Sequence, residues 1–167
     1  EERWELAGEA VRKALEMLRS SRMEEGERLR VTIGDSVRVL ASFRDRIASL
    51  SVENKELAIN RFKERMRSLS CDAGIDPVRL HQEAAFLIDR LDITEECDRL
   101  GSHLAALSNL LGNPGDVVGK RFDFLVQEVF RELNTASSKS AHIGISELVV
   151  NAKTDLEKIR EQIQNVE

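Results

Sequence analysis

The feature that most constrains the fold is a seam of residues whose spacings alternate between four and three. Its members are Leu29, Ile33, Ser36, Leu40, Phe43, Ile47 and Leu50. A helix returns to the same face every three or four residues, so this spacing predicts a helix that packs against other helices as in coiled coils. No useful run alternates apolar and polar residues, as a half-buried strand would. The sequence therefore predicts an all-α fold of long antiparallel helices, in coiled-coil-like hairpins or a bundle.

The helix that carries the seam is expected to be interrupted. A shorter apolar stripe lies upstream and consists of Val11, Leu15 and Leu18. The stretch SRMEEGE between the two contains Gly26. A glycine inside a helix costs about 1 kcal/mol, so a break there is the favoured interpretation. SLSVEN at the end of the seam is read as a weak turn. Residues 1–70 are thus predicted to form a long helical hairpin for assembly, and residues 71–167 a C-terminal helical domain.

Turn and cap residues mark the later helices. SCDAGIDP is the clearest loop, and its Asp76 before Pro77 predicts a helix start. Asp92 followed by Glu95 has the spacing of a capping box. After the helix-ending stretch GNPGD, the apolar spacings predict helices over about residues 117–133 and 146–164.

Composition limits the classes of partner. The net charge is −5 and no block is strongly basic, so only a basic surface gathered by folding would support nucleic-acid binding. No apolar run approaches the length of about 18 residues that spans a bilayer. Cys71 and Cys97 lack zinc-site spacing, and Cys97 falls on an apolar stripe as a small buried hydrophobe. We expect a soluble, cytoplasmic protein without a membrane partner. Because the chain starts at Glu1 rather than Met, we also expect it to be part of a longer protein.

The helix after Lys120 has two distinct faces. Its apolar face consists of Phe122, Val126, Val129 and Leu133. Arg121, Glu128 and Glu132 share the opposite face, because spacings of seven and four return to one side of a helix. This is either a solvated face with ion pairs, or an acidic pair that holds a divalent ion such as Mg²⁺ or Mn²⁺, beside arginines that hold phosphate. Phe124 also points outward, which favours a subunit interface.

The same helix runs into the polar stretch NTASSKS, where we expect it to end. The stretch is either a cap with a linker or a set of groups for phosphate oxygens. In the second case the groups are Asn134, Thr135, Ser138 and Lys139.

A second polar cluster combines Glu96, Arg99 and His103 on one helix face, with Arg90 just before the turn. A single histidine on a helix is usually structural or merely exposed. Beside carboxylates and arginine, a histidine is also suited to general acid–base work on a phosphodiester, because its pKa lies near neutrality. No Gly-rich phosphate loop, Walker motif, HExxH or nucleophile elbow is present.

Four blocks of the chain resemble the bacterial YicC/YloC family and follow its order. They read SRMEEGERL, RLHQEAAFLIDRLDITEECDRLGSH, GKRFDFLVQEVFRELNTASSKS and ELVVNAKTDLEKIREQIQNVE. The resemblance implies a metal-dependent endoribonuclease of the bacterial cytoplasm that assembles as a hexamer around RNA. It covers the middle and C-terminal part of the family, whose N-terminal domain has no counterpart here.

The resemblance also carries site residues over by position. The family's polar helix motif falls on Arg121, Asp123, Gln127, Glu128, Arg131, Glu132, Asn134, Thr135, Ser138, Lys139 and Ser140. Its second motif falls on Asp89, Arg90, Asp92, Glu95, Glu96, Arg99 and His103, and its last helix on Glu157, Arg160, Glu161, Gln162, Gln164 and Asn165. Phe130 departs from the pattern, because family members often have Asn there. It falls on the core side, so we expect little effect.

Two functions are therefore expected. The first is an endoribonuclease with catalytic residues His103, Glu96, Arg121, Glu128 and Glu132. Its metal ligands are Glu128 and Glu132, and its RNA-binding residues are Arg90, Arg99, Arg121, Arg131, Asn134, Ser138 and Lys139. The alternative is a non-catalytic helical assembly or adaptor module built on the seam.

Overall fold

The computed structural model describes residues 2–69, 77–112, 118–140 and 142–164. These residues form five helices. They are α1 (Glu2–Leu69), α2 (Pro77–Leu91), α3 (Thr94–Gly112), α4 (Val118–Lys139) and α5 (Ile143–Gln164). No strand occurs within these ranges, which confirms the all-α prediction. None of the described helices is long and apolar enough to cross a membrane.

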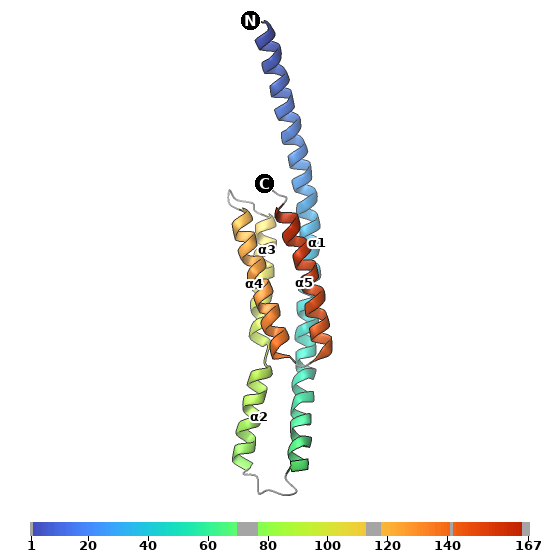
Figure 1. Cartoon of the computed structure of the whole chain (residues 1–167), viewed down its shortest axis with the longest axis vertical. Helices are drawn as coiled ribbons and strands as arrows, with labels where there is room; N and C mark the ends of the chain where they lie inside the picture. Colours follow the sequence, from blue (N-terminus) through green and yellow to red (C-terminus); the bar gives the residue numbers. More distant parts are fainter. Residues whose placement is uncertain (1, 70–76, 113–117, 141, 165–167) are drawn as a thin grey trace.

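Four of the helices close a bundle around one hydrophobic core. Helix α1 contacts α3 and α5, and α4 contacts both α3 and α5. Figure 1 shows that α1 extends beyond this bundle at both ends, with α2 beside its C-terminal part. The largest fully buried side chains are Phe122, Ile47, Ile93, Leu107, Leu133, Ile145, Leu156, Ile159, Val126, Val129 and Val149. Each buried side chain of this size contributes about 1.5–3 kcal/mol relative to exposure, so this core fixes how α3 and α4 face each other.

The seam on α1 supplies its side of that core. Ile33, Leu40 and Ile47 are buried, while Phe43 and Leu50 pack against the core from its edge. The prediction that this stripe packs against other helices is confirmed. The seam joins residues 33–47 to the same core as residues 93–163, so the two predicted regions pack together. The assembly role of the first region stays a prediction.

The predicted interruptions of α1 are wrong. Residues 2–69 form one helix, so these residues contain no hairpin. A side chain at Gly26 would meet nothing within 4 Å, so this glycine marks neither a close contact nor a turn. In the predicted turn, Ser51 is buried and its hydroxyl donates to the Ala48 carbonyl at 2.7 Å. Polar side chains end a helix when they compete for its backbone hydrogen bonds, but here the Ser51 hydroxyl bonds within the helix, which therefore continues. The loop predicted at SCDAGIDP and the cap at Asp76 lie outside the described residues.

The polar stretch after Leu133 does not end its helix either. Helix α4 continues to Lys139 because hydroxyls in this stretch bond back to carbonyls of their own helix. The Thr135 hydroxyl donates to the Arg131 carbonyl at 3.0 Å, and the Ser138 hydroxyl donates to the Thr135 carbonyl at 2.9 Å. The expected cap-and-linker is therefore wrong for this segment, and Asn134, Ser138 and Lys139 stand on a helix.

Asp92 joins α1 to the turn between α2 and α3. Its Oδ1 accepts hydrogen bonds from the backbone N–H and the hydroxyl of Thr94, at 2.9 and 2.6 Å, and lies 2.9 Å from the Lys55 ammonium. These interactions, led by the Thr94 hydroxyl, lower the pKa of Asp92 to about 2. The capping box is not formed as predicted, since Glu95 pairs with Arg99. Asp92 still caps the first turn of α3, because its carboxylate accepts the hydrogen bond of the Thr94 backbone N–H.

We predict that Asp92→Ala lowers the free energy of unfolding by about 1 kcal/mol, the usual cost of losing an N-terminal cap. Asp92→Asn should lose less, because an amide oxygen still accepts the Thr94 bonds. The folded-state pKa of Asp92 lies below its unfolded value, so its charge contributes stability above pH about 4 and loses it as pH falls toward 2. Urea unfolding at pH 7 and pH 3 measures both effects. Equal losses for Ala and Asn at pH 7 would contradict the capping role.

Candidate functional site

One group of potential metal ligands lies between α3 and α4. His103 on α3 and the pair Glu128 and Glu132 on α4 each offer a ligand atom, and these atoms lie within 4.8 Å of one another. The spacing of four places both carboxylates on one face of α4. The contact between α3 and α4 then brings that face to His103. The structure thus adds an imidazole to the acidic pair that the sequence singled out.

The carboxylates do not lie on a solvent face as predicted. Glu132 is only 3% exposed, and Glu128 and His103 are half-buried. Helix α4 contacts α3, so Glu132 is covered, whereas Phe124, Gln127 and Arg131 on other parts of the polar face stay exposed. Arg121, at the start of α4, does remain exposed. The exposed-face prediction is therefore correct for Arg121 and wrong for Glu132.

The buried Glu132 is weakly compensated within the protein. Its Oε1 lies 3.8 Å from Nη1 of Arg99, which is an ion pair beyond hydrogen-bond distance. A buried carboxylate is costly unless it is paired with a cation and hydrogen-bonded. Two carboxylates with one imidazole form a suitable ligand set for Mn²⁺, and carboxylates also suit Mg²⁺. The residues present therefore fit a divalent ion at this position.

A second buried carboxylate marks the other end of the α3–α4 contact. Glu96 is 6% exposed, and its Oε1 lies 2.6 Å from the Lys139 ammonium. That ammonium also donates to the Asp92 carbonyl at 3.3 Å. Lys139 is therefore engaged inside the protein rather than presented to solvent. Glu96 lies two helical turns before His103 on the same face of α3, since the spacing is seven.

These charges form three ion-paired groups on α3 and α4, which we together call the ion-pair ladder. Its members are Glu95, Glu96, Arg99, Glu128, Arg131, Glu132 and Lys139, and His103 stands within it. The sequence predicted most members as site residues on two separate helices. It could not show that the two sets face each other, because that requires the antiparallel contact of α3 with α4. The ion pair of Arg99 with Glu132 was not anticipated.

The other predicted residues stand apart from the three ligands. Arg121 lines a separate surface hollow with Lys120, Phe124, Asn109 and neighbouring residues of α3 and α4. Arg90, Asn134 and Ser138 are exposed at other positions. Phe124 is exposed, as predicted, with 59% of its surface open. Their roles toward RNA stay predictions.

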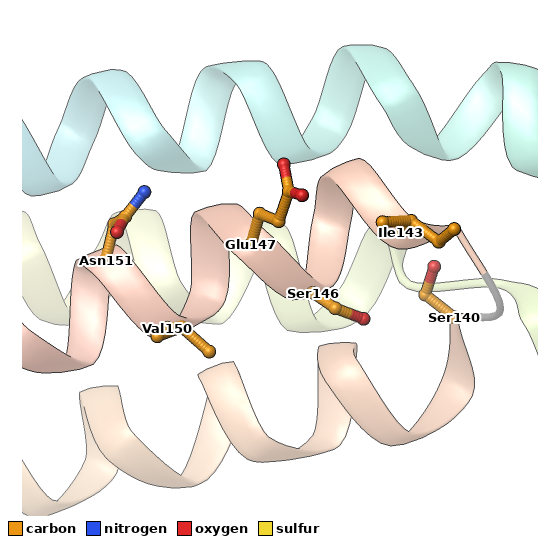
Figure 2. A pocket seen from close by; sticks show the side chains of 6 residues that line it. All are labelled: Ser140, Ile143, Ser146, Glu147, Val150 and Asn151. Carbon is orange, nitrogen blue, oxygen red and sulfur yellow. The ribbon is translucent and has the colours of Figure 1, made fainter.

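Another hollow runs along α5 and was not singled out by the sequence. Ser140, Ile143, Ser146, Glu147, Val150 and Asn151 line it. Figure 2 shows five of these side chains along one stretch of α5 and Ser140 just after the end of α4, with Ser146 and Val150 on the side of α4. Among its described lining residues Glu147 alone is charged, and Ile143 and Val150 are exposed apolar side chains. These residues do not provide the convergent ionisable groups that phosphate or metal chemistry needs.

Cys97 is part of the hydrophobic core, next in sequence to Glu96 of the ladder. It is 5% exposed, and burial raises the pKa of its thiol. The prediction of a small buried hydrophobe is confirmed.

Comparisons with a family model and with curated proteins agree on one family. The sequence model of the family described as "Endoribonuclease YicC-like, C-terminal" matches residues 47–167. The chain is 41% identical over 165 residues to "Probable endoribonuclease YicC" of Clostridioides difficile strain 630. This alignment covers 98% of this chain and 56% of that protein. It is 36% identical over 150 residues to the protein of the same name from Haemophilus influenzae, covering 87% of this chain and 50% of that protein.

The chain thus spans about half the length of the curated relatives it matches. All three candidate ligands and the whole ion-pair ladder fall inside the matched range, so the site is part of the shared domain. On this evidence, the chain belongs to the YicC-like endoribonuclease family.

Proposed function

We propose that this chain carries the RNA-cleaving centre of a bacterial endoribonuclease, with a divalent ion held by His103, Glu128 and Glu132. The relatives' names support the reaction class. The observation that carries the proposal is the convergence of an imidazole and two carboxylates from two helices, within 4.8 Å of one another. A structural salt bridge needs only one base and one acid, whereas this group has two acids and two flanking arginines.

Each residue of this centre has a distinct task in the proposal. A bound Mg²⁺ or Mn²⁺ would supply Lewis-acid stabilisation of the phosphoryl oxygens and a more acidic water. Glu132 is held in place by its burial between α3 and α4, and Glu128 stands one turn away, nearer to solvent. His103 would offer one ring nitrogen to the ion, and its other ring nitrogen would remain for proton exchange with the reacting groups.

The arginines would neutralise charge on the phosphodiester. Arg99 and Arg131 are half-exposed or more and stand next to the carboxylates, so their guanidinium groups can reach a phosphate at the centre. Arg121, Arg90, Asn134 and Ser138 would contact the RNA backbone farther along the strand. Glu96 would act as a positioning residue, since its buried ion pair with Lys139 fixes the end of α4 against α3.

Assembly would help to solve the charge problem. The chain carries a net charge of −5, which opposes RNA binding by one copy alone. Several apolar side chains on the free N-terminal part of α1 are exposed, namely Trp4, Leu6, Val11, Leu15, Met17, Leu18 and Met23. We propose that this part of α1 and Phe124 join copies of the chain into a cytoplasmic homo-oligomer. A hexamer, as the family resemblance implies, would gather arginines from several copies around one RNA.

The exposed part of α1 also favours the alternative function, a helical assembly or adaptor module without chemistry. The two functions differ in their need for a metal ion. We predict that EDTA abolishes RNA cleavage by the natural full-length protein and that added Mn²⁺ or Mg²⁺ restores it. Cleavage of a labelled RNA on a denaturing gel measures this. Specific RNA binding without metal-dependent cleavage would support the adaptor and contradict the enzyme.

We predict that His103→Ala and Glu132→Gln each lower the cleavage rate by about 10²–10³-fold, the usual loss when a group that stabilises transition-state charge is removed. Both variants should also weaken Mn²⁺ binding, as measured by titration calorimetry. Asp35→Asn is the matched control, because Asp35 is an exposed carboxylate on α1 that pairs with Arg38. Wild-type rates in both site variants would place the metal elsewhere.

We predict that Val11→Asp combined with Leu15→Asp lowers the assembled mass in sedimentation, because a charge within an apolar interface is costly. Ser20→Asp adds a charge to an exposed polar position of the same helix and should leave the mass unchanged. An unchanged mass in the double variant would exclude this face of α1 from the assembly.

A further inference from the structure

Both carboxylates of the proposed metal centre already stand beside a guanidinium group. Nη1 of Arg99 lies 3.8 Å from Oε1 of Glu132, and Nη1 of Arg131 lies 3.7 Å from Oε2 of Glu128. Both distances exceed that of a charge-assisted hydrogen bond, which is about 2.7–2.9 Å. The arginine side chains are 54% and 70% exposed, whereas the Glu132 side chain is 4% exposed. The Glu132 carboxylate is held by burial, whereas both arginine side chains are largely exposed, and Arg99 also donates to the exposed Glu95.

The remaining cation of the ladder is held differently. Lys139 contacts the buried Glu96 at 2.6 Å and also donates to the Asp92 carbonyl. A short ion pair with a buried partner is costly to break, because it leaves an uncompensated charge. Lys139 therefore keeps its place, and only Arg99 and Arg131 can change partners within the ladder.

The local charge also changes sign when a divalent ion is added. The ion-pair ladder contains four carboxylates and three positively charged side chains, so its net charge is −1 when His103 is counted as neutral. A divalent ion raises this to +1. A phosphodiester is repelled by the first state and attracted by the second, so metal binding and RNA binding must favour each other at this position.

From these contacts we propose a cation exchange that regulates the centre. Arg99 and Arg131 neutralise Glu132 and Glu128 while no metal ion is bound, and metal binding releases both guanidinium groups to RNA phosphates. This inference rests on the proposed metal centre. Arginine is suited to binding RNA phosphates because its planar guanidinium group can donate two parallel hydrogen bonds to one phosphate.

The exchange has an unusual consequence for variants. Each arginine competes with the metal ion for its carboxylate, so its removal should strengthen metal binding. The same removal should weaken RNA binding in the presence of metal, because a phosphate contact is lost. A purely structural ion pair predicts the reverse for metal, since loss of the arginine would disorder the ligands.

The test measures both affinities in the natural full-length protein. Mn²⁺ binding is titrated by calorimetry, and binding of a fluorescein-labelled 2′-O-methyl oligoribonucleotide of mixed sequence is followed by anisotropy with and without Mn²⁺. The variants are Arg99→Gln and Arg131→Gln. Arg38→Gln is the control, because Arg38 pairs with Asp35 at a spacing of three, like Arg131 with Glu128, but on α1. Circular dichroism confirms that each variant is folded.

We expect Mn²⁺ to strengthen wild-type RNA binding by about tenfold, within the usual range of coupling between two sites. Arg99→Gln and Arg131→Gln should bind Mn²⁺ about threefold to tenfold tighter and lose most of that RNA gain, while Arg38→Gln matches wild type. If wild type binds no Mn²⁺, the metal centre fails and the exchange fails with it. If His103→Ala abolishes Mn²⁺ binding but both arginine variants bind Mn²⁺ no tighter than wild type, the centre stands and the exchange is overturned.

Discussion

A carboxylate buried between two helices requires a cation, and Glu132 imposes this requirement on the contact between α3 and α4. Two cations meet this requirement to different degrees. Lys139 compensates Glu96 at one end, and Arg99 stands beside Glu132 in the middle. The middle pair is the longer of the two, at 3.8 Å against 2.6 Å. The contact is therefore tightly closed at the end of α4 and loosely compensated at His103, which is where a divalent ion fits.

The apolar core determines where these charges meet. Helix α1 provides the seam against which α3 and α5 pack, and α4 completes the ring. Leu107 and Phe122 are fully buried within that ring and set the register of α3 against α4. Because the register is fixed by apolar packing, the charged residues need not hold the helices together. The Arg99 and Arg131 side chains are more than half exposed, so their guanidinium groups can serve binding without disturbing the apolar core.

Much of this architecture follows from the sequence. The spacing of the seam predicted its burial, and the apolar positions from Phe122 to Leu133 correctly gave the core face of α4. The failures have physical causes. Gly26 was weighed by its intrinsic helix cost, although residues on both sides keep the helix intact. The hydroxyls of Thr135 and Ser138 were expected to end α4 but bond to its carbonyls. A helical wheel shows which residues share a face, but not which helix covers that face, so Glu132 was placed in solvent. The approach of His103 to Glu128, across 25 positions of sequence, depends on the fold alone.

The central claim is that a divalent ion binds between His103, Glu128 and Glu132. The most direct measurement is an anomalous difference map at the manganese absorption edge, from crystals of the protein grown with Mn²⁺. The account predicts one strong peak about 2.0–2.3 Å from the imidazole nitrogen and from an oxygen of each carboxylate. It also predicts that Nη1 of Arg99 lies farther from Glu132 than its present 3.8 Å. A map without a peak at this position, with Arg99 still against Glu132, would contradict the account.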